Sequence, residues 1–162
     1  MRNFKYWVPV ILVMIVIYWM STEAFSSRRT LSIIGQIIRF FAPSLSRKEI
    51  IMISGVIRKL AHVIEYMVLG ILLFRAFRAG SYERLWRRWG GYSLAAVVLY
   101  GMIDEFHQLH VPMRTASLID VGYDTLGGFI GQCISIVYYD RKQPELKGCG
   151  WRQGKKSPFQ ST

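Results

Sequence analysis

The sequence predicts an all-α, polytopic membrane protein with about four transmembrane helices and one or two short interfacial helices. Hydrophobic residues make up 52% of the chain, and the mean hydropathy is positive at +0.24. The formal net charge is nevertheless +11, and the Lys and Arg residues cluster between apolar runs. Soluble domains rarely combine high charge with high hydropathy, whereas polytopic membrane proteins place basic clusters in their loops. This distribution also argues against a nucleic-acid partner, which would require a basic face.

Four apolar runs are candidates for the spans: Tyr6 to Met20, Leu60 to Phe74, Tyr92 to Ile103 and Leu118 to Tyr139. A helix needs ~20 residues to cross the hydrocarbon core. Only the fourth run is long enough by itself, so the second and third runs must extend into their polar flanks. The flanking charges are therefore expected at or inside the membrane boundary.

The first apolar run has two interpretations. It follows Arg2 and Lys5 and precedes "STEAFSS", where Thr22 and Ala24 form a passable signal-peptidase signature. Aromatic residues flank both ends of the run, and a retained first span places every basic cluster on one side of the membrane. We therefore favour a retained anchor over a cleaved signal peptide.

Basic clusters lie at the N-terminus, between the second and third runs, and after the fourth run. The positive-inside rule places all three in the cytoplasm, so both termini are predicted to be cytoplasmic in a multi-pass protein of the cell membrane. Residues 21–59 and 107–117 then lie outside. The predicted transmembrane domain covers residues 1–140, and residues 141–162 form a basic tail that is predicted to be disordered.

The first outer segment contains two helical patterns. "TLSIIGQIIRFFAP" places Leu31, Ile34, Ile38 and Phe41 at helical spacing, which is typical of an amphipathic interfacial helix. "SRKEIIMISGVIRKLAH" begins with a capping box of Ser46 and Glu49 and predicts a second such helix. Both helices either bind the lipid surface or pack on the outer end of the bundle.

Ionisable and polar residues extend into three of the predicted spans. The proposed topology gathers them in the outer half of the membrane. They are Arg58, Lys59, His62, Glu65 and Tyr66 in the second span, Asp104, Glu105 and Gln108 in the third, Arg114 in the loop, and Asp120 and Asp124 in the fourth. A charge at the centre of a span costs at least about 2.5 kcal/mol on insertion scales. We therefore expect Arg58, Lys59 and Arg114 to pair with Glu65, Glu105, Asp120 and Asp124. Singly these residues are ordinary interfacial residues, but together they form a candidate site.

The fourth span continues with Gly127, Gly128 and Gly131, a GxxxG arrangement that permits close helix packing. This packing directs Asp120 and Asp124 into the bundle. Alternatively, the glycine face packs against a second copy of the chain and forms a homodimer.

Several of these motifs resemble the VanZ-like family of bacterial membrane proteins. The resemblance covers roughly Arg58 to Gly131 and rests on "RKLAHVIEYMVLGILL", "DEFHQLHVPMRTASLIDVGYDTLGGFIG" and the basic loop between them. It extends to these positions: Lys59, His62, Glu65, Tyr66, Glu105, Gln108, Arg114, Asp120, Asp124, Gly127 and Gly131. Two positions depart from the common pattern, because Met113 stands where Gly is frequent and Asp124 stands where Asn is frequent.

The namesake of this family accompanies glycopeptide-resistance clusters and is associated with teicoplanin resistance. The resemblance therefore implies a cell-envelope role in a Gram-positive-like bacterium. Membrane lipids and a lipid-linked cell-wall precursor are the implied partners.

Three functions remain open at this stage. In the first, Arg58, Lys59, Tyr66, Gln108, Arg114, Asp120 and Asp124 bind an anionic lipid-linked envelope component. In the second, His62 with Glu65 or Glu105 acts as a catalytic general base in lipid-linked phosphate or acyl chemistry, although no Ser or Cys nucleophile stands beside His62. The third is a small proton-coupled transporter. One His with carboxylates is weak evidence for zinc, so no metal site is predicted, and no cofactor is specified.

Overall fold

The fold is all-helical over the residues that the structure describes, which are 4–22, 27–79, 86–111 and 117–150 of a computed structural model. Within these ranges the chain forms five helices and no strand. They are α1 (Phe4–Met20), α2 (Ser27–Phe41), α3 (Arg47–Arg78), α4 (Trp86–Leu109) and α5 (Leu118–Gly150). The all-α prediction is confirmed for this part of the chain.

Helix α3 corrects the predicted boundary between the second interfacial helix and the second span. The predicted capping box is present, since Ser46 N–H donates to Glu49 Oε2 at 2.7 Å and Glu49 N–H donates to Ser46 Oγ at 3.4 Å. The helix then runs without interruption to Arg78. The two predicted elements are one helix because no residue between them ends it, and an isolated Gly55 is tolerated inside a helix.

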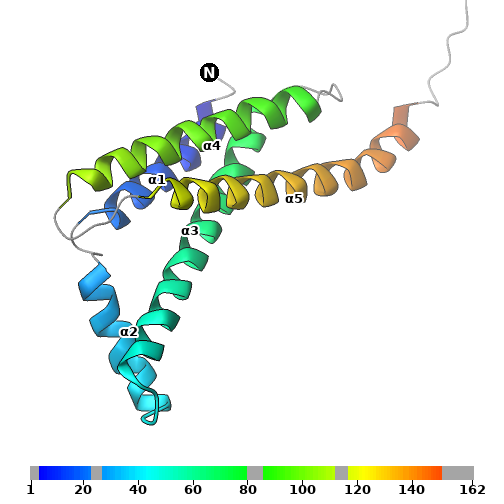
Figure 1. The fold of residues 1–162 in the computed structure, drawn as a ribbon. Coiled ribbons are helices and arrows are strands. Elements are labelled where there is room, and N and C mark those ends of the chain that lie inside the picture. The colour runs from blue at the N-terminus through cyan, green and yellow to red at the C-terminus, as the bar shows by residue number, and fades with distance from the viewer. Residues whose placement is uncertain (1–3, 23–26, 80–85, 112–116, 151–162) are drawn as a thin grey trace, which may run out of the picture.

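The two halves of α3 have different neighbours (Figure 1). Its C-terminal half packs against α1, α4 and α5, and α2 packs along its N-terminal half. Alpha2 and the first half of α3, Arg47 to Lys59, form a hairpin that projects from the other helices; we call it the α2–α3 hairpin. The buried core consists of Val10, Ile17, Tyr66, Leu69, Leu73, Ala76 and Val97. Because α1 contributes two of these residues, it is an integral part of the core.

The two ends of the bundle differ in chemistry. At one end Gln108 of α4 donates to Ser21 Oγ, just past α1. At the other end Arg75 lies over the ring of Tyr6 at 5.3 Å, and Arg78 lies over the ring of Tyr139 at 3.9 Å. The last turn of α3 therefore meets the start of α1 and the later part of α5 through cation–π contacts.

The membrane prediction is supported by one helix. Among the described helices, α3 is the one long and apolar enough to cross a membrane, and α1 and residues Thr30–Phe41 of α2 are apolar but shorter. The four-span arrangement stays a prediction.

Helix α5 continues past residue 140 to Gly150, so the first residues of the predicted tail are helical. The polar residues after residue 140 include Lys, Gln and Glu, which are good helix formers. The remainder of the predicted tail, residues 151–162, lies outside the described ranges.

Candidate functional site

The centre of the candidate site is a His–Asp contact between α3 and α5. His62 Nδ1 lies 3.3 Å from Asp124 Oδ1, within ion-pair distance. The exposed fractions of the two side chains are 12% and 1%. The contact lacks hydrogen-bond geometry, since both atoms are without a hydrogen bond in the described structure. Asp124 is therefore a buried carboxyl group with an imidazole as its neighbour.

Helix α4 closes this centre through a glycine. A Cβ placed on Gly101 would lie 3.3 Å from Asp124 Oδ2 and 3.7 Å from Tyr66 Cε1. Tyr66 is fully buried on α3, and its ring centroid is 6.2 Å from that of Tyr100 on α4. Gly101 thus lets the α4 backbone approach the point where Tyr66 and Asp124 meet.

Two further polar side chains of α4 lie on the same buried face. Gln108 Nε2 donates to Asp104 Oδ2 at 2.9 Å and to Ser21 Oγ at 3.4 Å. Asp104 and Gln108 are only 2% and 1% exposed. Gln108 therefore links the end of α4 to the end of α1.

Glu105 points towards the start of α5. Its Oε2 accepts a hydrogen bond from Ser117 N–H at 2.7 Å, directly before α5 begins. A carboxylate is favourable at a helix N-terminus because the free N–H groups carry partial positive charge. Glu105 also lines a cavity of about 250 Å³ whose other walls are mainly apolar, with contributions from Met102, Phe106 and Leu118.

We define the polar cluster as His62, Tyr66, Asp104, Glu105, Gln108 and Asp124. Each of its members has at least one buried polar atom without a hydrogen bond in the described part of the chain. These atoms are His62 Nδ1, Tyr66 Oη, Asp104 Oδ1, Glu105 Oε1, Gln108 Oε1, and Asp124 Oδ1 and Oδ2. Leaving a buried polar group unsatisfied costs about 1–3 kcal/mol. Most of these atoms are carboxyl or amide oxygens, so the cluster requires hydrogen-bond donors.

The remaining predicted site residues lie around this cluster. Lys59 Nζ lies 4.8 Å from the ring centroid of Tyr123, on α5. Arg58, Glu65 and Asp120 are half-buried, and Arg114 lies outside the described residues. For two of these residues the observed neighbour is not one of the predicted ion-pair partners, since Asp124 lies beside His62 and Lys59 lies over the ring of Tyr123.

The glycines of α5 explain why Asp124 reaches His62. A Cβ on Gly127 would overlap the carbonyl oxygen of Val63, and one on Gly131 would overlap that of Met67. On the adjacent face, a Cβ on Gly128 would lie 2.6 Å from Val97 Cγ1 of α4. The glycine face thus packs against α3 within one chain, and a homodimer through this face would have to displace α3.

Three contributors to the site were missed in the sequence: Ser21, Tyr100 and Gly101. A signal for Gly101 was present, because Val97, Gly101, Asp104 and Gln108 recur at helical spacing and all four are buried. Ser21 and Tyr100 carried no comparable signal, because their roles depend on contacts between α1 and α4. In the described ranges, no group of three or more His, Cys, Asp or Glu side chains has a geometry suited to a metal ion.

Comparison with known protein families identifies the family of this chain. A family model described as VanZ/LLP1 matches residues 6–139, which is most of the chain and includes every predicted site residue. Comparisons with curated proteins and with solved structures gave no match.

Proposed function

The chain belongs to the VanZ/LLP1 family, and on this premise we propose that it is a multi-pass membrane protein of the cell envelope whose polar cluster binds an anionic, lipid-linked envelope component. The resemblance seen in the sequence is confirmed by the family match. The ligand and the membrane topology are our proposals.

The unsatisfied oxygen atoms of the polar cluster carry this proposal. Asp104, Glu105, Gln108 and Asp124 each hold a buried oxygen without a donor among the described residues. Sugar hydroxyls and peptide N–H groups are donors of the kind that these oxygens require. A head group built from sugar or peptide would therefore satisfy the cluster, whereas an anion alone would be repelled by its carboxylates.

The anionic part of such a ligand must lie beside the polar cluster. Lys59 precedes His62 by about one helical turn, and its ammonium group lies on the α5 side of α3 over Tyr123. Arg114, which the resemblance assigns to the site, stands between α4 and α5 in the sequence and is outside the described residues. A phosphate bound near Lys59 would be close to the cluster without facing all of its carboxylates.

The apolar part of the ligand has a candidate position as well. Met102, Phe106, Leu109 and Leu118 line the cavity of about 250 Å³ and are exposed on the protein surface. Glu105 belongs both to this cavity and to the polar cluster. A lipid chain in the cavity would therefore place its head group beside the cluster.

An enzymatic role is the second candidate, and the His62–Asp124 contact favours it. A carboxylate beside one imidazole nitrogen orients the ring so that the other nitrogen can take a proton. Asp124 at 3.3 Å from Nδ1 would leave Nε2 of His62 for this role. In that case loss of the imidazole base would abolish turnover while ligand binding persists.

The test compares wild type with His62→Ala, Asp104→Asn and Asp124→Asn, each expressed in a teicoplanin-susceptible Gram-positive host. Growth in teicoplanin and retention of envelope lipids by the purified protein are measured together. We expect all three variants to lose protection, and the two Asp variants to retain several-fold less lipid because the charged acceptors are lost.

Asp140→Asn is the matched control, because it removes an exposed carboxylate of the same helix, α5. It should behave as wild type at equal membrane abundance. Equal lipid retention by wild type and both Asp variants would contradict ligand binding by the cluster. If His62→Ala alone loses protection while lipid retention is unchanged, catalysis replaces binding as the explanation.

A further inference from the structure

We propose a second ligand site in the α2–α3 hairpin, where a groove binds the phosphate head group of an anionic phospholipid at the membrane surface. The groove has a volume of about 350 Å³, and Ser32, Gly35, Gln36 and Arg39 of α2 face Arg47 and Ile50 of α3 across it. None of these residues belongs to the polar cluster. This site therefore does not depend on the function proposed above.

Two arginines from different helices supply the positive charge of the groove. Arg39 lies in the last turn of α2, and Arg47 begins α3. Both side chains are exposed, and neither forms an ion pair with a carboxylate in the described structure. The nearby Glu49 accepts the N–H of Ser46 in the capping box. The guanidinium groups are thus available to phosphate oxygens, whose geometry matches their planar arrangement of donors.

The groove exists because α2 and α3 approach closely at its floor. Gly35 is buried, and a Cβ placed on it would lie 3.4 Å from Ile50 Cγ2. Leu31 and Ile51 add apolar surface beside the arginines. A phosphate at the arginines would therefore have apolar contacts available for the glycerol and the first part of the acyl chains.

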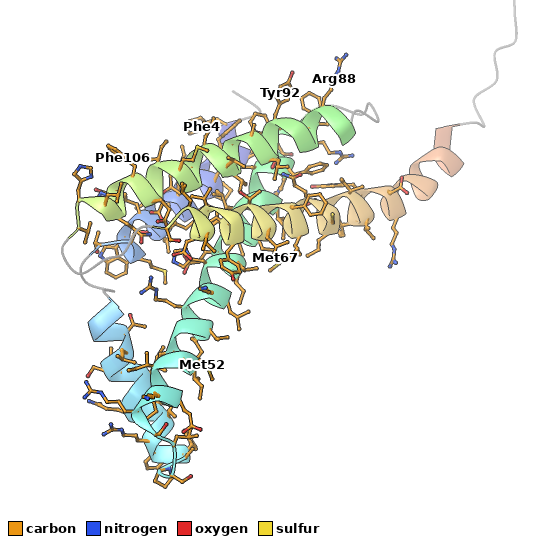
Figure 2. All side chains as sticks on the ribbon, viewed as in Figure 1. Phe4, Met52, Met67, Arg88, Tyr92 and Phe106 are labelled. Carbon is orange, nitrogen blue, oxygen red and sulfur yellow. The ribbon has the colours of Figure 1, made fainter. Side chains whose placement is uncertain are left out.

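The surroundings of the groove favour a membrane phospholipid over a free phosphate. Phe40 and Phe41 are 82% and 79% exposed, and Ile33, Ile37 and Met52 are also exposed on the hairpin. Figure 2 shows Met52 on the part of α3 that projects from the other helices. Basic and apolar side chains on one surface are the combination that binds anionic membrane interfaces.

Native mass spectrometry of the full chain in detergent, titrated with phosphatidylglycerol or phosphatidylcholine, tests this site. Wild type should prefer phosphatidylglycerol. The double substitution R39Q/R47Q should weaken phosphatidylglycerol binding on the order of tenfold, because both charge-assisted contacts are lost. R39K/R47K retains the charge without the planar arrangement of donors and should show intermediate affinity.

K48Q/R88Q is the matched control, since it also removes two exposed positive charges. Lys48 does not line the groove, and Figure 2 shows Arg88 far from the hairpin. This control should bind phosphatidylglycerol as wild type does. Far-UV circular dichroism and the thermal midpoint confirm that each variant retains its fold.

Two results would overturn the inference. Equal weakening in R39Q/R47Q and K48Q/R88Q would show a general charge effect. Displacement of phosphatidylglycerol by an equal concentration of inorganic phosphate would show that the groove recognises free phosphate instead of a lipid.

Discussion

Asp124 shows at the scale of single residues how this chain holds a carboxyl group away from water. Its side chain is 1% exposed, and His62 Nδ1 is 3.3 Å from one of its oxygens. Burying an unpaired charge is costly, so a neighbouring imidazole, a bound proton or a ligand donor must offset that cost. Tyr66 Oη is also buried without a hydrogen bond, so a second polar group adds to this cost at the same place. Such a local cost is typical of functional sites.

Gly101→Ala tests the geometry of this centre. The added methyl group would lie 3.3 Å from Asp124 Oδ2, so the carboxyl group beside His62 must shift by a few tenths of an ångström. We expect reduced teicoplanin protection and reduced lipid retention, with normal expression and helix content.

Gly91→Ala on the same helix is the control, since a Cβ there has nothing within 4 Å. It should match wild type in both assays. Identical behaviour of the two variants would show that the position of Asp124 is not critical.

Helix α3 is the central element of the fold, because one half of it lies in the core and the other half lies in the exposed α2–α3 hairpin. Its C-terminal half contributes Tyr66, Leu69 and Leu73 to the core. Its N-terminal half exposes Met52 and Val56 and packs against α2. The resulting surface of the hairpin is apolar on several sides, which suits a membrane interface better than water.

Gly131→Ala tests the packing of α5 on α3. A Cβ at this position would overlap the carbonyl oxygen of Met67, so the helices must separate. Overpacking of this kind costs about 1–3 kcal/mol. We expect a lower thermal midpoint of the purified protein in detergent.

Gly122→Ala on the same helix provides the comparison. A Cβ at Gly122 has open space around it, so better helix propensity should leave the midpoint unchanged or raise it slightly. Equal midpoints for the two variants would contradict close packing at Gly131.

The whole molecule has a polar end and a basic, aromatic end. The polar end holds the Gln108–Ser21 and Glu105–Ser117 contacts. The opposite end holds Arg75 over Tyr6 and Arg78 over Tyr139. Lys and Arg are enriched on the cytoplasmic side of membrane proteins, whereas Trp and Tyr are enriched at both interfaces. The proposed orientation therefore predicts that the end with Arg75 and Arg78 faces the cytoplasm and that the polar cluster faces outwards.

Cysteine labelling tests the proposed topology in a C133A/C149A background. Thr22→Cys and His110→Cys lie at the polar end. Ala79→Cys directly follows α3, and Arg141→Cys lies in the part of α5 that is predicted to be cytoplasmic. A membrane-impermeant maleimide should label the first pair in intact cells and the second pair only after permeabilisation. Labelling of all four in intact cells would contradict four spans, and the reverse pattern would invert the orientation.

Features that depend on residues close together in the sequence were predicted correctly, whereas features that depend on residues far apart in the sequence were not. The amphipathic pattern around Ile34 and Ile38 predicted α2, and the Ser46–Glu49 pair predicted where α3 begins, because both signals are local in the chain. The end of α4 was harder to predict, since the third apolar run ends at Ile103 and Asp104 and Glu105 are polar. In the structure they are helical and buried. Asp104 accepts a hydrogen bond from Gln108, which also reaches Ser21, and Glu105 accepts one from Ser117 N–H, so residues distant in sequence complete their surroundings.

By itself, the sequence determined that this protein is helical, that its polar residues interrupt apolar segments, and that it belongs to the VanZ/LLP1 family. Helical period and local capping depend on neighbours within a few positions, so one chain is enough to show them. Only the tertiary structure decided that His62 meets Asp124, that Gly101 closes the site, and that Arg39 faces Arg47 across a groove. These contacts depend on the distances and rotations between helices, which side-chain packing sets and which no local pattern encodes.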